Sequence, residues 1–254
     1  MLSVVFEPVT ESLPAGAHAS RGGGPTRPGE GRQRLLAVAE QLLATRGLAV
    51  PNREIVAAAG QRNRSAITYH FGSRAGLIDA VRERHEAPIA QHRQHLIARL
   101  RGPEDRTTRH LVEAYVRPLA AEMLRCAPSY WARLSEMLQA GPSQALSPGG
   151  EPSARARPPQ RADTVLAELL RLMVARLSHL PELEAHGRVA LTVQFASAGL
   201  ARWERDSQAG VDSVAPLAPF TLILTDLAVA MLDAPSSVPP QIAAHLRHPH
   251  LADH

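Results

Sequence analysis

Several features are missing from this chain of 254 residues, and each absence excludes a class of protein. It has a single cysteine, Cys126, which excludes an internal disulfide framework and any zinc site built from several cysteines. We interpret Cys126 as a small core residue rather than a redox sensor, because no neighbour in the sequence would activate a lone thiol. No run of about 18 apolar residues occurs, so we expect no membrane-spanning helix.

The N-terminus lacks the basic head and apolar stretch of a secretory signal, and we therefore expect a cytoplasmic protein. Lysine is absent, so all 28 basic residues are arginines, and the formal net charge is +4. No Ser-His-Asp arrangement, phosphate-binding loop or paired-carboxylate pattern is evident. The sequence therefore predicts neither an enzyme nor a cofactor.

Apolar residues recur at helical spacing along most of the chain, and no stretch alternates in the manner of a strand. We therefore predict an all-α fold with an N-terminal head over residues 32–87 and a helical body over 88–233. Pro88 marks the expected end or kink of a helix at this boundary. Glycine, proline and serine content predicts a disordered arm over 1–31, a mobile loop over 140–160 and a flexible tail over 234–254.

Within the head, the pattern predicts four short helices. Leu35, Leu36, Ala39, Leu42 and Leu43 form one apolar face that ends at Gly47. A second helix follows Pro51 as far as Ala59, a third runs from Arg64 to Phe71 behind Asn63 as its N-cap, and Ser73 caps a fourth. In the body, helices are expected over 89–100, 165–180, 189–205 and 217–232, with two more around 111–123 and 131–138.

The third helix of the head has two distinct faces. Ile67 and Phe71 lie four residues apart and face the core, whereas Arg64, Ser65, Thr68 and Tyr69 face away from it. An arginine can bond a guanine edge in bidentate fashion, and small hydroxyl side chains suit bases or phosphates. The segment 52–74 also carries four arginines against one glutamate, which is the sign that a phosphate backbone requires.

Three short motifs surround this helix: Ala58-Ala59-Gly60 before it, Tyr69-His70-Phe71 at its end, and Gly72-Ser73-Arg74 opening the next helix. Together with the leucine-rich first helix they make residues 32–87 resemble the N-terminal domain of TetR-family transcriptional regulators. The resemblance implies an all-α dimer with a helix-turn-helix head and a divergent ligand-binding body. It places the DNA-contacting positions on Arg53, Arg64, Ser65, Ala66, Thr68, Tyr69, His70 and Arg74.

The chain departs from the commonest family spacing by one residue, because Gln61-Arg62 lengthens the turn before the third helix. A subgroup of the family resembles it in a longer Gln-Arg-Asn-x-Ser-Ala turn. The departure leaves an alternative open, which is a helical small-molecule-binding or interaction protein whose head no longer reads DNA. A sequence-specific regulator, acting as a ligand-responsive repressor on a double-stranded, pseudo-palindromic operator, remains the first hypothesis.

The last two long helices are the expected dimer interface, since the final one is apolar on more than one stripe. An effector of unknown identity is expected in the body, and its candidate pocket residues are the larger apolar and aromatic side chains there. Metal binding by His85, His92 and His95 or by the histidines of the tail is a weaker interpretation, and we predict no metal site. The pocket candidates are Tyr115, Met123, Trp131, Met137, Phe195 and Trp203.

Overall fold

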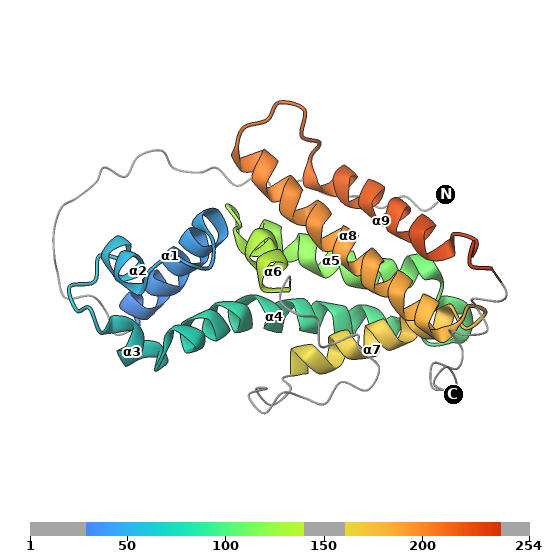
Figure 1. Cartoon of the computed structure of the whole chain (residues 1–254), viewed down its shortest axis with the longest axis horizontal. Helices are drawn as coiled ribbons and strands as arrows, with labels where there is room; N and C mark the ends of the chain where they lie inside the picture. The colour runs from blue at the N-terminus through green and yellow to red at the C-terminus, as the bar shows by residue number, and fades with distance from the viewer. Residues whose placement is uncertain (1–28, 140–160, 240–254) are drawn as a thin grey trace, which may run out of the picture.

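A computed structural model describes residues 29–139 and 161–239, and in these two ranges the chain forms helices without any strand (Figure 1). The prediction of an all-α fold is confirmed. The segments expected to form the arm, the loop and the tail lie almost entirely outside the described residues, although α1 begins at Glu30, inside the expected arm. The helices are α1 (Glu30–Arg46), α2 (Asn52–Ala58), α3 (Ala66–Phe71), α4 (Arg74–Arg99), α5 (Thr108–Arg125), α6 (Trp131–Gln139), α7 (Arg161–Arg176), α8 (Glu182–Gln208) and α9 (Leu217–Asp233), with a 3-10 turn at Pro103–Asp105.

The head is formed by α1, α2, α3 and the first half of α4, which lie together at one end of the molecule (Figure 1). Their apolar side chains share one core, and Phe71 packs against its edge. This agrees with the predicted inward face of the third helix. The fully buried members of the head core include Leu35, Leu43, Ile55, Ile67 and Leu77.

The turns of the head follow from two local signals in the sequence. Gly60 has a φ of +66°, a region that favours glycine, and it ends α2. The N–H of Gly60 donates to Ala57 O and that of Gln61 to Val56 O, which is the hydrogen-bond pattern of a Schellman cap. At the start of α4, Ser73 Oγ accepts a hydrogen bond from Gly76 N at 3.0 Å, as predicted for an N-cap.

The helix end expected near Pro88 does not occur, because α4 runs unbroken from Arg74 to Arg99 with Pro88 inside it. Proline in a helix interior loses one hydrogen bond and crowds the preceding turn. Here the helix is held on both sides of Pro88 by buried residues, among them Val81, His85 and Ile89. One continuous helix therefore belongs to the head at its N-terminal end and to the body at its C-terminal end.

The body packs α5, α7, α8, α9 and the second half of α4 around a second core. Helices α8 and α9 approach closely at Gly199, where an added methyl group would lie 2.7 Å from a methyl carbon of Leu224. The short helix α6 lies between α1 of the head and α8 of the body. Its N-terminus is closed by Glu204 of α8, whose carboxylate accepts hydrogen bonds from the backbone N–H groups of Ala132 and Arg133.

Gly76 provides a test of the packing between α3 and α4. A methyl group added there would lie 2.1 Å from the backbone oxygen of Phe71, which cannot move without displacing the end of α3. We expect Gly76→Ala to lower the free energy of unfolding by about 1–3 kcal/mol, as overpacking does. The matched control is Gly187→Ala in α8, where an added methyl group meets nothing within 4 Å and should raise helix stability by up to about 1 kcal/mol.

Urea denaturation of both variants checks this expectation. Equal effects of the two substitutions, or a neutral Gly76→Ala, would contradict the packing described for the α3–α4 turn.

Candidate nucleic-acid interface and effector site

The third helix begins later than the sequence predicted. It starts at Ala66, and Arg64 and Ser65 lie in the turn that precedes it. The reason is the side chain of Asn63, whose Oδ1 accepts a hydrogen bond from Ser65 N at 2.9 Å and so closes a turn of its own instead of capping a helix at Arg64. The extra residue of the lengthened turn is thus absorbed before the helix begins.

Five of the eight predicted contact residues are exposed on one side of the head, in α2, the turn and α3. Tyr69 is 81% exposed, although large aromatic side chains are usually covered. His70 is half-buried and lies edge-on to Tyr69, with ring centroids 4.8 Å apart. The exposed residues are Arg53, Arg64, Ser65, Thr68 and Tyr69.

Two of the predicted contact residues are placed differently from the expectation. The methyl group of Ala66 is buried in the head core, at 3% exposure, so its side chain is not available to DNA. Arg74 is half-buried and bonded within the head: it donates to Asn52 Oδ1 at 2.7 Å and to Leu48 O at 2.6 Å. The guanidinium of Arg74 therefore ties the start of α4 to the turn between α1 and α2.

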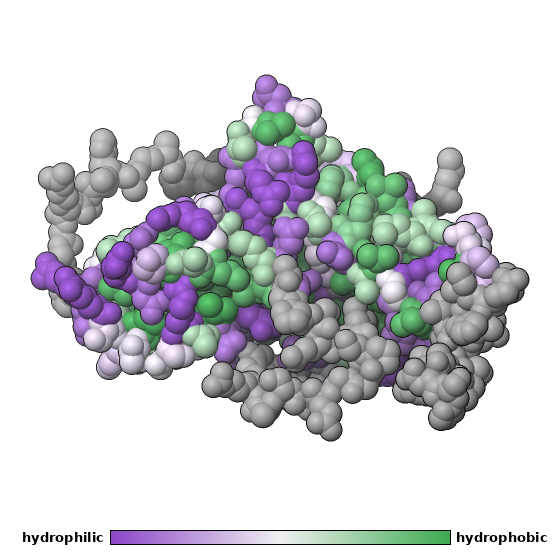
Figure 2. All heavy atoms as spheres, viewed as in Figure 1, coloured by the Kyte–Doolittle hydropathy of each residue, from purple (hydrophilic) through white to green (hydrophobic). Residues whose placement is uncertain are grey.

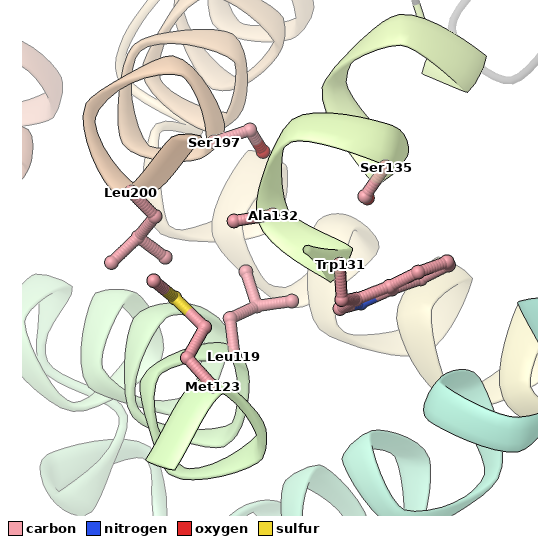
Figure 3. Close-up of a pocket in the computed structure, with 7 residues that line it drawn as sticks. All are labelled: Leu119, Met123, Trp131, Ala132, Ser135, Ser197 and Leu200. Atoms are coloured by element: carbon pink, nitrogen blue, oxygen red, sulfur yellow. The ribbon is translucent and has the colours of Figure 1, made fainter. Parts of the chain in front are cut away.

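A small cavity lies in the body, between α5, α6 and α8 (Figure 3). Its volume is about 10 Å³, which is room for roughly one water molecule. Most of the wall is apolar. The polar side-chain groups of the lining residues are the hydroxyls of Ser135 and Ser197 and the buried, unpartnered indole N–H of Trp131, and the Ser197 hydroxyl bonds Tyr115 Oη at 2.8 Å. The lining residues are Leu119, Met123, Trp131, Ala132, Ser135, Ser197 and Leu200.

The candidate pocket residues do not all meet at this cavity. Met123 and Trp131 line it, and Tyr115 adjoins it through Ser197. Met137 instead packs against the head core, and Phe195 packs at the edge of the body core. Trp203 donates its indole N–H to Ala215 O at 2.8 Å and so fastens the connection between α8 and α9. Small serine side chains carry no signal in a sequence that would have marked them as pocket residues.

A buried ionic bridge, which no pattern in the sequence indicates, joins the head to the body. His85 of α4 is fully buried, with Nδ1 2.6 Å from Glu122 Oε1 of α5 and Nε2 3.0 Å from Glu40 Oε2 of α1. Arg125 closes the network on the other side of Glu122, with Nε 2.7 Å from Oε2. The ring of His85 stacks on Trp131 of α6, with centroids 4.7 Å apart.

Burial alone would lower the pKa of His85, but its hydrogen bond to Glu122 and its charge interactions with Glu40 and Glu122 outweigh burial and raise the pKa above 6.5. Burial would likewise raise the pKa of Glu122, yet His85 and Arg125 lower it to about 2. The network therefore favours the protonated form of His85, which lies between the carboxylates of Glu40 and Glu122. Such a pair stabilises the fold only while both partners keep their charge.

The same surroundings leave Cys126 unreactive. Its Sγ lies 3.5 Å from Glu122 Oε1, and burial together with the charge of Glu122 raises the thiol pKa to about 11. A thiol reacts as its thiolate, which is scarce at neutral pH when the pKa is this high. The position fits the interpretation of Cys126 as a structural residue.

Helices long and apolar enough to cross a bilayer are not found within the described ranges.

The match to a known protein family lies in the head. A family model described as "Bacterial regulatory proteins, tetR family" matches residues 35–81, which span most of α1 through the first turns of α4. No curated protein matches the chain at a significant level. Among solved structures, a TetR-family regulator from Streptomyces coelicolor A3 is similar at 16% sequence identity. The match covers 82% of this chain and 99% of that one, with a TM-score of 0.34.

The raised pKa of His85 predicts how stability depends on pH. A base whose folded pKa lies above its unfolded value adds stability that is complete below about pH 6.5 and is lost as the pH rises through the folded pKa. The free energy of unfolding should therefore fall above pH 6.5. The lowered pKa of His92 acts below that value, and the thiol of Cys126 titrates near 11, so neither obscures the window.

Urea denaturation at intervals between pH 6 and 9 measures this slope in the wild type and in His85→Gln, which keeps an amide donor but no titrating group. We expect the variant to be less stable and to lose most of the slope, while the control His179→Gln, at an exposed histidine after α7, keeps it. If His85→Gln keeps the pH dependence of the wild type, a titrating group other than His85 causes that dependence.

Proposed function

The chain belongs to the TetR family of bacterial regulatory proteins, and we propose that it is a dimeric, ligand-responsive repressor that binds a pseudo-palindromic operator. DNA binding in transcription regulation is what membership of the family implies. The repressor role, the dimer and the effector are inferences of our own from the geometry of the head and the body.

The observation that carries the proposal is the exposed polar surface formed by the turn and α3 on a well-packed head. Arg64 and Ser65 lead into the helix, and Thr68 and Tyr69 are exposed on it. Among the described residues, no hydrogen bond or ion pair occupies these four side chains. The helix is anchored from behind by Ile67. We assign base contacts to Arg64, Ser65 and Thr68, and phosphate contacts to Arg53, Tyr69 and His70.

A dimer is supported by apolar side chains that the single chain leaves exposed on its last two helices. Figure 2 shows apolar residues gathered over α9 and the adjoining part of α8. Leu222, Ile223 and Leu227 of α9 are each more than half exposed, as is Leu191 of α8. A patch of this kind marks an interaction surface. We propose that α8 and α9 of a second copy cover it, which would place two heads on one face of a duplex.

An effector would act through the cavity wall. Trp131 is a lining residue of the cavity, its ring stacks on His85, and His85 pairs with Glu40 of the head. A ligand larger than the present cavity has to displace this wall. We propose that the displacement disturbs the stacked pair and favours a second orientation of the head, so that the ligand and the operator compete through a shift of population.

The direct test is binding of the purified protein to the DNA upstream of its own gene, measured by fluorescence anisotropy against a scrambled duplex at two salt concentrations. We expect salt-sensitive binding with a clear preference for the upstream DNA. Arg64→Ala should cost about 1–3 kcal/mol on the specific duplex and relax the preference at one base position. The matched control Arg53→Ala should weaken both duplexes alike and reduce the salt dependence.

Equal losses on both duplexes for Arg64→Ala would make Arg64 a phosphate contact and shift the assignment along the turn. Absence of any sequence preference in the wild type would contradict the regulator and favour the alternative, a helical binding protein whose head does not read DNA.

The proposed interface has its own test in Leu227→Glu, which places a charge on the exposed stripe of α9. Burying an unpaired carboxylate is unfavourable, so we expect this variant to be monomeric by light scattering at concentrations where the wild type is a dimer. Leu124→Glu is the control, because Leu124 is 63% exposed on α5, outside the proposed interface. A dimeric Leu227→Glu would place the interface elsewhere.

A further inference from the structure

Arg93 of α4 is a buried cation in the body, and it forms no ion pair with any residue that the structure describes. Its side chain lies on the buried stripe of α4 that also carries His85 and Ile89, and the residue is only 4% exposed. The Nε–H group has no hydrogen-bond partner, and no ion pair reaches Arg93 from any residue in the described ranges. Its guanidinium lies over the ring of Tyr115, 5.5 Å from the centroid.

Such an arrangement is costly in a folded core. Arginine is rarely buried this deeply unless it is paired, and an unpaired buried charge loses its hydration without recovering it elsewhere. Burial lowers the pKa of Arg93, with Tyr115 and Glu86 acting in the opposite direction. Glu86 lies two helical turns away, where its Oε1 is 3.1 Å from Arg82 Nη2 while its buried Oε2 has no hydrogen-bond partner. A contact with the face of Tyr115 offsets only part of the lost hydration.

The other buried, charged arginine of the body is paired, which makes the contrast informative. Arg133 donates from Nε to Glu204 Oε2 at 3.1 Å and from Nη2 to Gln208 Oε1 at 2.5 Å. The chain thus supplies a carboxylate where a buried guanidinium serves only to hold helices together. At Arg93, no carboxylate of residues 29–139 or 161–239 lies within ion-pair distance, and the charge of Glu86 acts only at longer range.

The position of Arg93 connects it to the cavity. Tyr115, which it covers, bonds Ser197 of α8, and Ser197 forms part of the cavity wall. Thr192, on the same helix, is 2% exposed, and its hydroxyl also has no partner. The remaining wall is apolar, formed by Leu119, Met123, Trp131 and Leu200, as Figure 3 shows. Arg93 therefore lies behind Tyr115, next to the cavity without lining it, and the unpartnered hydroxyl of Thr192 lies on the same helix as Ser197.

We propose that the body binds a small organic monocarboxylate, with its carboxylate paired to Arg93 and its apolar part against the wall formed by α5, α6 and α8. This inference rests on the proposed function in one respect, since it names the chemical class of the effector. The ligand supplies the counter-charge that the fold omits. Uncharged molecules of the same shape leave Arg93 unpaired and bind more weakly.

The first test needs no ligand. An arginine retained for binding weakens the free protein, so Arg93→Met, which keeps the length and the helix preference of the side chain, should raise the melting temperature by at least about 2 °C. The matched variant Arg133→Met should lower it, because Glu204 would be left buried and unpaired. A lower melting temperature for Arg93→Met as well would make Arg93 a structural cation and overturn the proposal.

The second test measures melting temperatures with hexanoate, octanoate and benzoate, each against its uncharged primary amide at equal concentration. We expect a concentration-dependent rise with the carboxylates in the wild type, a smaller one with the amides, and no difference between acid and amide in Arg93→Met. Equal shifts for acids and amides in the wild type, or no carboxylate-dependent shift there, would overturn the proposal.

These measurements contain no DNA and therefore separate the two claims. Carboxylate binding through Arg93 with no effect on operator affinity would support the site while removing its regulatory role. If the wild type binds no DNA but does bind carboxylates through Arg93, the proposed function is contradicted and the carboxylate site is supported.

Discussion

The arrangement of this protein depends on one buried ionic bridge. His85 is enclosed between Glu40 of the head and Glu122 of the body, and its ring lies against Trp131 of the helix wedged between them. Four helices, α1, α4, α5 and α6, meet at this single side chain. Removing one member would leave charged groups buried without a partner, which is among the most destabilising changes a core can suffer. The head is thus held to the body by ion pairs as well as by apolar packing. Its orientation therefore depends on the positions of Glu122 and Trp131 in the body.

Because α4 is continuous, it connects the ionic bridge directly to both the head and the body. The helix begins at the Ser73 cap behind α3, carries His85 at the junction and Arg93 in the body, and is not interrupted at Pro88. The side chains that would sense a ligand and those that hold the head therefore lie on one buried stripe of one helix. Trp131 adds a second connection, because it contributes both to the cavity wall and to the stack on His85. A change in the cavity has two short routes to the head.

Local signals made most of the head predictable from the sequence. Gly60 and Ser73 mark turns that few other residues would allow, and the spacing of Ile67 and Phe71 identifies the buried side of α3. The start of α3 was misplaced because Asn63 closes a turn with Ser65 N, and the same side chain would look identical in the sequence as a helix cap. The sequence also predicted a helix end near Pro88, but packing on both sides of this residue outweighs the local preference against a proline in a helix.

The body was less predictable, because its informative residues owe their roles to partners far away in the sequence. Nothing in the pattern around His85 reveals that Glu40 and Glu122 converge on it, and Arg93 resembles any arginine on an amphipathic helix until its surroundings are known. Large apolar side chains were chosen as pocket residues by size. Some of them, such as Met137 and Trp203, instead hold helices together, whereas the serine hydroxyls at the cavity are too common in sequences to be noticed.

Hydroxyl-radical footprinting on the DNA upstream of the gene tests most directly whether two heads, each fixed to its body, present α3 to successive major grooves. We predict two symmetrically placed protected patches on one face of the duplex, with centres separated by about one helical turn, roughly 34–36 Å, or a small multiple of it. A single protected patch, or uniform protection without preferred positions, would contradict this arrangement of the heads.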